Sequence, residues 1–365
     1  MTDITKMCRK GINNLGVYAP GKPIEEVKRE LGLEHIIKLA SNENPFGCSP
    51  KAIEKIKEEA ENVFLYPDGN GYYLKQTISE HYNIKVSQII LGNGSEEIVH
   101  MIARGFINQD DETIMAVPSF PRYETVTRIM GGIPIQVPLK DFKYDLPAIA
   151  SKITGKTKII FVCNPNNPTA TILRKDELDE FLSQLPQDII LVFDEAYSEY
   201  VDDPQYKSGL TYLKEGYENI IVLKTFSKIY GLAGLRIGYG ISSPQIIDIL
   251  NKVREPFNTN RIAQKAAIEV LKDQEFVNKV RKENSKGRMY LEKAFDKMGL
   301  EYVKSYTNFI FVNIKKDSKT IFEKCLQRGI VVRPGYIFGY PQYLRITIGT
   351  EEQNEKLVEI LKQLL

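Results

Sequence analysis

Short apolar runs that each end in a polar or glycine-rich turn are the feature that most constrains the fold of this chain. They begin near residue 89, at residues 89–91, 113–117, 158–162, 189–193 and 220–223. Near-continuous β-branched runs of this kind are typical of strands that are buried on both faces. Helical stretches separate several of them, such as residues 95–104 and 175–184. The alternation predicts an α/β fold in which helices cover a mostly parallel central sheet.

The character of the sequence changes after about residue 255. Charged helical stretches such as residues 276–297 follow, and then short strand-like runs at residues 309–312 and 344–348. We expect a large domain over residues 41–255 and a smaller α+β domain over residues 256–365. Residues 1–40 are expected to be an irregular N-terminal arm that joins the smaller domain, with a proline- and glycine-rich turn at residues 20–23.

Composition excludes several classes of protein. The formal net charge of +2 argues against a nucleic-acid binder, which would carry a strongly basic face. No apolar run approaches the roughly 20 residues that a membrane helix needs. The N-terminal sequence has no apolar core of a signal peptide, so we expect a cytoplasmic protein.

Cysteine and histidine usage gives no sign of a metal site. The four cysteines lie far apart and form no paired motif, which favours free thiols over a disulfide or a zinc site: Cys8, Cys48, Cys163 and Cys325. The three histidines are not at zinc-ligand spacings. We therefore predict an enzyme without a metal.

Reactive side chains cluster after the predicted strands, where ligands bind in parallel α/β sheets. Lys228 follows the run at residues 220–223. A lysine in such a cleft can form a Schiff base once burial or a nearby cation lowers its pKa. The hydroxyls of Thr225 and Ser227 and the guanidinium of Arg236 are groups that bind phosphate. A lone lysine here would more often be solvated, but these neighbours favour a phosphate-bearing ligand.

The segment from Thr225 to Gly238 closely resembles the cofactor-lysine signature of fold type I pyridoxal-phosphate-dependent aminotransferases, in their histidinol-phosphate branch. The resemblance runs in family order over nearly the whole chain. It implies that Lys228 carries pyridoxal 5'-phosphate covalently as an aldimine. It also implies that Arg236 binds the cofactor phosphate, assisted by Ser227 and Thr225, and that residues 41–255 form the cofactor-binding domain.

Asp194 ends a predicted buried strand, and a buried carboxylate needs a cationic partner. The resemblance implies that this partner is the pyridine nitrogen of the cofactor. It further implies that Tyr197 and Asn167 hydrogen-bond the phenolic oxygen of the ring. A helix cap for Asp194 and a plain Asn-Pro turn for Asn167 are the alternative interpretations.

A glycine-rich turn at residues 92–94 leads into the predicted helix that begins at Ser95. Backbone amides at a helix N-terminus bind phosphate, although this turn is neither a P-loop nor a dinucleotide motif. The resemblance implies that Ser95 and Glu96 give backbone donors to the phosphate and that Phe120 stacks on the ring. It matches Tyr66 to a tyrosine that reaches the cofactor of a neighbouring subunit, and so implies a homodimer.

Two arginines are candidates for the substrate side of the site. Arg345 lies in a strand-like run and Arg333 in a Val-Val-Arg-Pro-Gly segment, and each guanidinium suits a bidentate anion contact. The resemblance implies that they hold the co-substrate carboxylate or the substrate phosphate; a surface salt bridge is the alternative for each. It also places Tyr18 and Asn44 beside the substrate.

Two positions depart from the family pattern. Ala170 stands where glycine usually follows Pro-Thr, and a positive φ there would cost alanine roughly 1 kcal/mol. Ile229 stands where a small residue usually follows the lysine. Neither position carries an expected catalytic role.

The function that the resemblance implies is transfer of an amino group between L-histidinol phosphate and 2-oxoglutarate, in histidine biosynthesis. An aromatic amino-acid aminotransferase and a pyridoxal-phosphate-dependent decarboxylase of a phosphorylated amino acid share most of these motifs. A catalytically idle cofactor-binding or scaffold protein is the alternative from another class. The expected partners are small-molecule substrates and a second copy of the chain, with no nucleic acid and no membrane.

Overall fold

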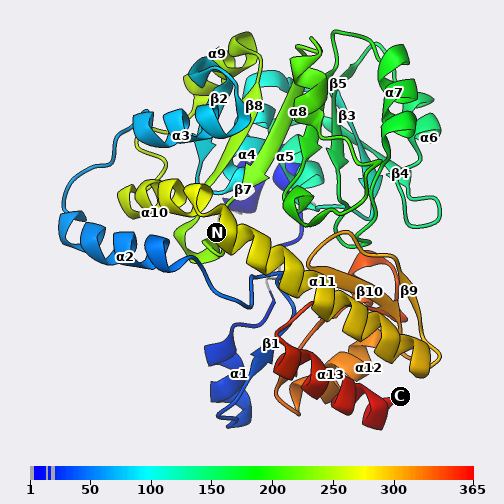
Figure 1. Cartoon of the computed structure of the whole chain (residues 1–365). Coiled ribbons are helices and arrows are strands. Elements are labelled where there is room, and N and C mark those ends of the chain that lie inside the picture. Colours follow the sequence, from blue (N-terminus) through cyan, green and yellow to red (C-terminus); the bar gives the residue numbers. More distant parts are fainter. Residues whose placement is uncertain (1–3, 14, 18–20) are drawn as a thin grey trace.

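Two lobes, each built around its own sheet, make up the part of the chain that the computed structural model describes, residues 4–13, 15–17 and 21–365. Figure 1 shows the larger lobe above the smaller one, with the long helix α11 (Gln274–Lys297) running from one to the other. None of the helices in the described residues is long and apolar enough to cross a membrane.

The larger lobe contains a seven-stranded sheet in which five neighbouring strands are parallel. The expected mostly parallel α/β sheet is therefore confirmed. The one strand that runs against its neighbours, β8, lies between β2 and β7. In spatial order the strands are β2 (Ile89–Gly92), β8 (Gly238–Ser242), β7 (Ile220–Thr225), β6 (Ile190–Asp194), β5 (Thr157–Cys163), β3 (Glu112–Val117) and β4 (Ile133–Pro138).

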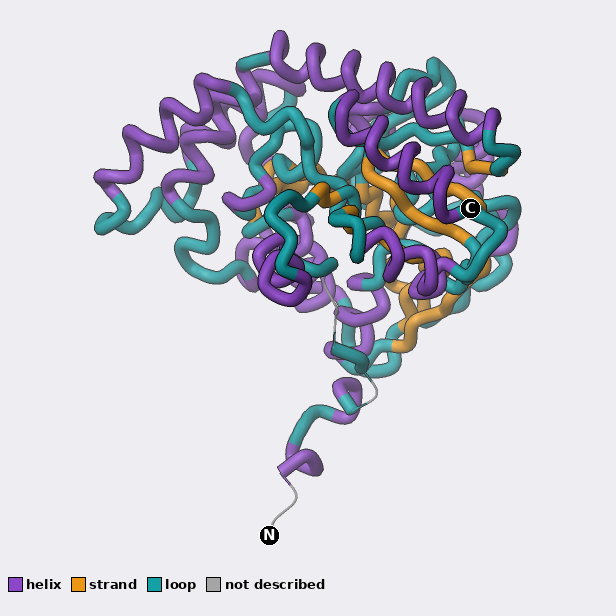
Figure 2. Tube along the Cα trace, turned by 90° about the horizontal axis from the view of Figure 1, so that it is seen from below, coloured by secondary structure: helices purple, strands orange, loops and turns teal. Residues whose placement is uncertain are grey.

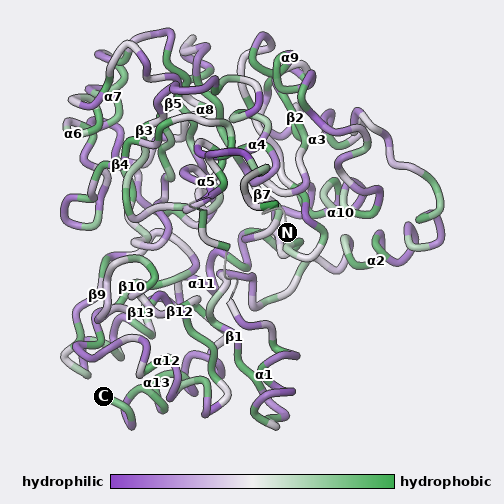
Figure 3. The backbone as a smooth tube through the Cα atoms, turned by 180° about the vertical axis from the view of Figure 1, so that it is seen from behind, coloured by the Kyte–Doolittle hydropathy of each residue, from purple (hydrophilic) through white to green (hydrophobic). Residues whose placement is uncertain are grey.

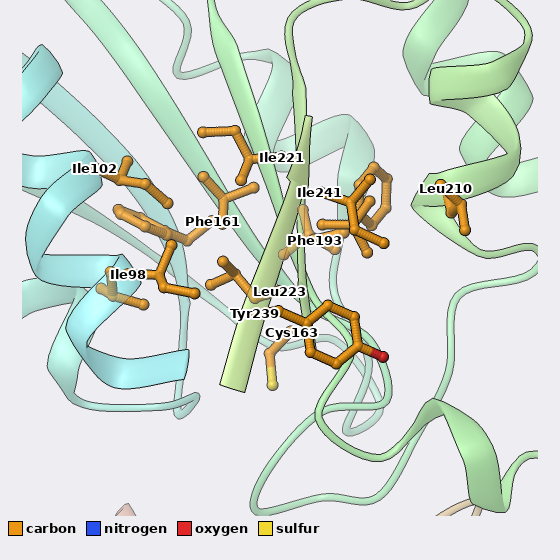
Figure 4. Packing of buried hydrophobic residues seen from close by; sticks show 14 of the residues in the cluster. Ile98, Ile102, Phe161, Cys163, Phe193, Leu210, Ile221, Leu223, Tyr239 and Ile241 are labelled. Carbon is orange, nitrogen blue, oxygen red and sulfur yellow. The ribbon is translucent and has the colours of Figure 1, made fainter. Parts of the chain in front are cut away.

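The central strands are mostly apolar because helices cover both faces of the sheet. Every residue of β7 is buried. Figure 4 shows Ile98 and Ile102 of α4 (Ser95–Phe106) on one side of the strands and Leu210 of α8 (Gly209–Lys214) on the other. The predicted strand runs at residues 89–223 thus form one shared core.

The remaining helices of the described chain surround the two sheets. Their bounds are α1 (Ile24–Leu31), α2 (Pro50–Glu59), α3 (Tyr72–Tyr82), α5 (Arg122–Met130), α6 (Leu146–Ala150), α7 (Lys175–Gln184), α9 (Pro244–Val253), α10 (Arg261–Lys272), α12 (Ser318–Leu326) and α13 (Glu351–Leu364).

The smaller lobe packs helices against a four-stranded antiparallel sheet and has a buried cluster of its own. Its strands in spatial order are β12 (Arg333–Pro334), β13 (Tyr343–Thr347), β10 (Phe309–Asn313) and β9 (Glu301–Val303). Helix α11 belongs to both lobes, since Val280 lies in the larger buried cluster and Leu291 in the smaller one. The domain boundaries expected at residues 40 and 255 stay predictions.

The N-terminal segment is less irregular than expected. Residues 24–31 form α1, and β1 (Ile37–Lys38) pairs in parallel with β11 (Ile330–Val331) of the smaller lobe. The local signals for α1 were present: Pro23 precedes it, and Gly32 ends it with a φ of +66°. Seen from below in Figure 2, the first described residues extend away from the body of the protein.

Ala170 has the positive φ that the family's glycine suggested, at +63°. The residue is fully buried, and its N–H donates to the carbonyl of Asn166. The left-handed conformation is therefore held by the turn in spite of the Cβ.

Candidate active site

A cavity of about 770 Å³ lies at the carboxyl ends of the parallel strands, between the two lobes. The segments that follow β7, β6 and β5 line it, as do β12 and β13 of the smaller lobe. It brings together the following predicted residues: Ser95, Glu96, Phe120, Asn167, Asp194, Tyr197, Thr225, Ser227, Lys228, Arg236, Arg333 and Arg345. These residues come from eight separate stretches of sequence, which converge at the sheet edge where parallel strands place ligands.

Lys228 lies just beyond β7, and its Nζ donates to the carbonyl of Ser41 at 3.1 Å. Burial, together with the nearby Arg345 guanidinium, lowers the pKa of the lysine to about 8. Roughly one tenth of this amine is therefore neutral at pH 7, far more than for an ordinary lysine, and the neutral form is the nucleophile or base.

Asp194 is the last residue of β6 and is buried. The Tyr123 hydroxyl donates to its Oδ2 at 2.7 Å, and the Ala196 N–H donates to its Oδ1 at 3.3 Å. Burial raises the pKa of this carboxyl, and the Tyr123 hydrogen bond opposes that rise. An anionic Asp194 would be stabilised by a cation placed in the cavity.

A cradle for an anion forms where α4 begins. Arg236 donates to Ser227 Oγ at 3.4 Å, and the Ser227 N–H donates to Thr225 Oγ1 at 3.1 Å. Gly94 precedes the helix with a φ of +75°, and a Cβ there would come within 2.7 Å of the Arg236 guanidinium. Free amides at the first turn of α4, a guanidinium and two hydroxyls are the donor set that a phosphate requires.

Asn167 and Arg345 meet at the wall that the smaller lobe provides. Arg345 Nη1 donates to Asn167 Oδ1 at 2.6 Å, and Nη2 donates to the Ala40 carbonyl at 2.5 Å. With its oxygen engaged, Asn167 has its amide hydrogens available for another acceptor. Arg333 is the register partner of Arg345 across β12 and β13, so the two guanidinium groups leave the same face of that sheet.

Two predicted residues that the structure describes are not among those that line the cavity. Tyr66 is exposed and stacks on Phe257, with ring centroids 4.7 Å apart. Asn44 is used within the fold: its Nδ2 donates to the Ile229 carbonyl and its Oδ1 accepts the Phe46 N–H. The expected substrate contact of Asn44 stays a prediction. Tyr18 lies outside the described residues.

Two residues near the cavity were not predicted. Asn42 lines the cavity and donates to the Tyr197 hydroxyl at 3.0 Å. Tyr123 touches Asp194 from beneath, with its ring stacked on Phe161 at 4.6 Å. The sequence signal for Asn42 is its place in the same Ser-Asn-Glu-Asn-Pro segment as Asn44. Tyr123 gave no local signal, because a buried tyrosine on a helix resembles ordinary core.

Among the described residues, no group of three or more histidine, cysteine, aspartate or glutamate side chains could hold a metal ion. The electrostatics of the cavity are instead those of a basic pocket with one buried carboxylate.

Comparison with known proteins agrees with this geometry. The family model for aminotransferases of class I and II matches residues 34–361. The chain belongs to this family. The predicted aminotransferase family is thus confirmed.

Its relatives include enzymes that match over almost their whole length. The histidinol-phosphate aminotransferase of Caldicellulosiruptor saccharolyticus is 52% identical, with 98% of this chain and 100% of that protein covered. That of Moorella thermoacetica is 51% identical, with 98% and 93% covered. The crystal structure of histidinol-phosphate aminotransferase from Sinorhizobium meliloti in complex with pyridoxal-5'-phosphate superposes with a TM-score of 0.89 at 26% identity, covering 98% of each chain.

Proposed function

We propose that this chain is a histidinol-phosphate aminotransferase that moves an amino group between L-histidinol phosphate and 2-oxoglutarate, giving imidazole acetol phosphate and glutamate. The observation that carries the proposal is the near-complete match, at about half of all positions, to relatives of that name. The cavity supports it, because Arg333 and Arg345 line one pocket. Both amino donors have an anionic end away from the reacting carbon, which a guanidinium can bind. The reaction belongs to histidine biosynthesis.

The cofactor is pyridoxal 5'-phosphate, and the donor set of the cavity fits it. The first turn of α4, Arg236, Ser227 and Thr225 would hold the phosphate. Asp194 would hold the proton on the ring nitrogen, which compensates the burial of its carboxylate. Phe120 would stack on the ring. When bound, the cofactor supplies an electron sink for the carbanion formed at the substrate.

The chain's own residues would carry out the remaining steps. Lys228 would bind the cofactor and, once released, take the proton from the α-carbon of the substrate and pass it on. Its pKa of about 8 suits a base that works near neutral pH. The free amide hydrogens of Asn167 and the hydroxyl of Tyr197 would donate to the phenolic oxygen of the ring.

Spectroscopy of the first half-reaction tests the proposal. The purified holoenzyme is mixed with L-histidinol phosphate, or separately with phenylalanine, with no keto acid present. We expect histidinol phosphate to convert the visible absorption band to that of the aminated cofactor far more readily than phenylalanine. A preference for phenylalanine would make the chain an aromatic amino-acid aminotransferase. Release of carbon dioxide from a phosphorylated amino acid without any keto acid would make it a decarboxylase.

We further propose that the active unit is a homodimer. The loop between α2 and α3 exposes Val63, Phe64, Leu65 and Tyr66, each between 48% and 79% exposed, and Phe257 lies beside Tyr66. Figure 3 shows hydrophobic colour on this outward loop. An exposed apolar patch of this kind marks an interaction site. A second copy that covers it would bring Tyr66 toward the partner's cofactor phosphate.

Sedimentation velocity tests the dimer directly. We expect the wild-type protein to sediment as a dimer and a Phe64→Glu variant to shift toward monomer. A wild-type monomer with full activity would overturn both the dimer and the role of Tyr66. A cytoplasmic location stays a prediction.

A further inference from the structure

A short chain of hydrogen bonds connects β13 of the smaller lobe to the hydroxyl of Tyr197. Its members are Thr347, Asn42 and Tyr197, and all three are buried. The Asn42 N–H donates to Thr347 Oγ1 at 3.0 Å, the Thr347 hydroxyl donates to Asn42 Oδ1 at 3.2 Å, and Asn42 Nδ2 donates to the Tyr197 oxygen at 3.0 Å. Asn42 has a φ of +56°, a conformation that asparagine adopts more readily than most residues.

Two hydrogen bonds of Thr347 set the directions of the protons in this hydrogen-bond chain. A backbone N–H can only donate, so Thr347 Oγ1 must accept the hydrogen of Asn42. The Thr347 hydroxyl donates its single proton to Asn42 Oδ1 at 3.2 Å. The amide of Asn42 is thereby fixed with its oxygen toward Thr347 and its NH2 group toward Tyr197.

This orientation decides what Tyr197 can do with its own proton. The amide nitrogen of Asn42 donates and cannot accept, so the Tyr197 hydroxyl must give its hydrogen to another group. Tyr197 lines the cavity, where a bound ligand can supply that acceptor.

We propose that Thr347 and Asn42 are positioning residues that direct the Tyr197 hydroxyl proton into the cavity. The inference rests on the proposed function, because it takes the acceptor to be the phenolic oxygen of the cofactor. It goes beyond that function because it makes Thr347 direct the Tyr197 proton, although Thr347 belongs to the smaller lobe and is not among the residues that line the cavity.

Strand β13 orients the second donor in the same way. Arg345, two residues before Thr347, lies on the same face of the strand and holds the oxygen of Asn167. The NH2 group of Asn167 is therefore also left for the cavity. One strand of the smaller lobe thus aims both hydrogen-bond donors at the place where the phenolic oxygen would lie.

The surrounding structure holds the chain of hydrogen bonds in place. The Thr347 N–H donates to the Leu39 carbonyl at 2.9 Å, and Asn308 Nδ2 donates to the Asn42 carbonyl at 3.0 Å. The titratable groups that face Tyr197 are Arg345 from β13, Asp194 from β6, Cys163 from β5 and Lys228. None of them is changed in the variants below.

The test is a pH titration of the visible absorption band of the holoenzyme. A donor to the phenolate oxygen stabilises the form that lacks the neighbouring proton, so its loss raises the midpoint of the titration. We expect Tyr197→Phe to raise the midpoint by about one pH unit, the size of one hydrogen bond to a charged group. Thr347→Val, which keeps the shape and removes the hydroxyl, should raise it by a part of that shift, and Thr347→Ser should restore the wild-type value.

A second variant reverses the polarity of the chain. In Asn42→Asp the carboxylate can only accept, so it draws the Tyr197 proton away from the cavity, and aspartate also tolerates the positive φ. We expect a shift as large as that of Tyr197→Phe. Combined with Tyr197→Phe, neither Asn42→Asp nor Thr347→Val should add anything. Thermal unfolding of each variant confirms that it is folded.

The outcomes separate the two proposals. If Tyr197→Phe raises the midpoint but Thr347→Val leaves it at the wild-type value, the positioning role is wrong while the role of Tyr197 stands. A shift by Asn42→Asp that persists on the Tyr197→Phe background would be an effect of the added charge, and would also overturn the positioning role. If Tyr197→Phe causes no shift, the contact of Tyr197 with the phenolic oxygen is wrong, and the inference fails with it.

Discussion

Lys224 and Lys228 lie close together at the end of β7, yet their surroundings move their pKa values in opposite directions. Burial alone would lower the pKa of Lys224, but the carboxylates of Glu195 and Glu199 outweigh it and raise that pKa well above its ordinary value. Burial lowers the pKa of Lys228 to about 8, and the Arg345 guanidinium adds to the effect. A buried lysine with carboxylate partners stays charged, whereas one beside a cation becomes reactive.

The neighbouring carboxylates Asp194 and Glu195 show the same contrast. Successive side chains at the end of a strand point to opposite faces of the sheet. Glu195 is fully buried, pairs with Lys224 at 2.9 Å and accepts the Gly209 N–H at 2.6 Å. Asp194 faces the cavity, where its protein partners are hydrogen-bond donors without charge. Lys224 and Glu195 on the reverse face thus satisfy each other within the fold, whereas Asp194 has only uncharged protein donors and can take a cation from a ligand.

The largest expected effect is that of replacing Lys228, the reactive lysine. We expect Lys228→Ala to lower kcat/KM by about 10⁴-fold or more, because the covalent attachment and the proton transfer are both lost. Its free energy of unfolding should not fall, since the variant removes an ammonium whose charge burial disfavours. Steady-state kinetics and urea denaturation measure the two quantities. Turnover close to wild type would overthrow the assignment of the site.

The next largest effect is that of replacing Lys224, the lysine that is paired within the fold. We expect Lys224→Met to lower the free energy of unfolding by about 3–5 kcal/mol, because Glu195 is left as an uncompensated buried charge. The loss of kcat in the folded fraction should be far smaller than for Lys228→Ala. Urea denaturation checks the first expectation, and activity per bound cofactor checks the second. The matched double variant Lys224→Met/Glu195→Gln should recover part of the lost stability, and a failure to do so would contradict the pairing.

Substitutions of the two carboxylates, Asp194 and Glu195, should have different effects on cofactor affinity. We expect Asp194→Asn to weaken cofactor binding by about 10²-fold, the order of one charge-assisted hydrogen bond in a buried site. The cofactor-free protein should lose little stability, because burial already disfavours the charged form of Asp194. Glu195→Gln should behave in the opposite way, with lower stability and nearly unchanged affinity per folded molecule. Equilibrium dialysis and denaturation of both variants distinguish these patterns.

Much of this arrangement could be predicted from the sequence, because it depends on local patterns. The apolar runs at residues 89–223 predicted strands β2, β3, β5, β6 and β7, and residues 175–184 match α7 at both ends. The motif after β7 led to the family that the comparisons confirm. Lys228 and Asp194 could be predicted because Asp194 ends a buried strand and Lys228 closely follows another.

The parts that were not predicted depend on contacts between distant segments. Strand β8 was not predicted, because its glycine-rich sequence does not resemble the apolar runs of the other strands. The pairing of Lys224 with Glu195 and the hydrogen bond from Asn42 to Tyr197 each join residues that are far apart in sequence. Tertiary packing decides such contacts, so no local pattern marks them.

The smallest expected effect is a dependence on pH that only Lys228 should show. Only the neutral amine attacks the cofactor aldehyde, so the rate at which cofactor-free protein captures pyridoxal phosphate should rise with pH, with a midpoint near 8. Arg345→Met removes the neighbouring cation and should move the midpoint upward, whereas Lys224→Met should leave it in place. The shifted pKa of Lys228 also affects stability. Between about pH 8 and pH 10.5, its ordinary pKa, Lys228 is protonated in the unfolded chain but neutral in the folded chain. The free energy of unfolding should therefore rise with pH in that range. Stopped-flow absorbance gives the midpoint. A midpoint near 10.5, or one that moves with Lys224→Met and not with Arg345→Met, would mean that the two lysines do not differ in the way their surroundings indicate.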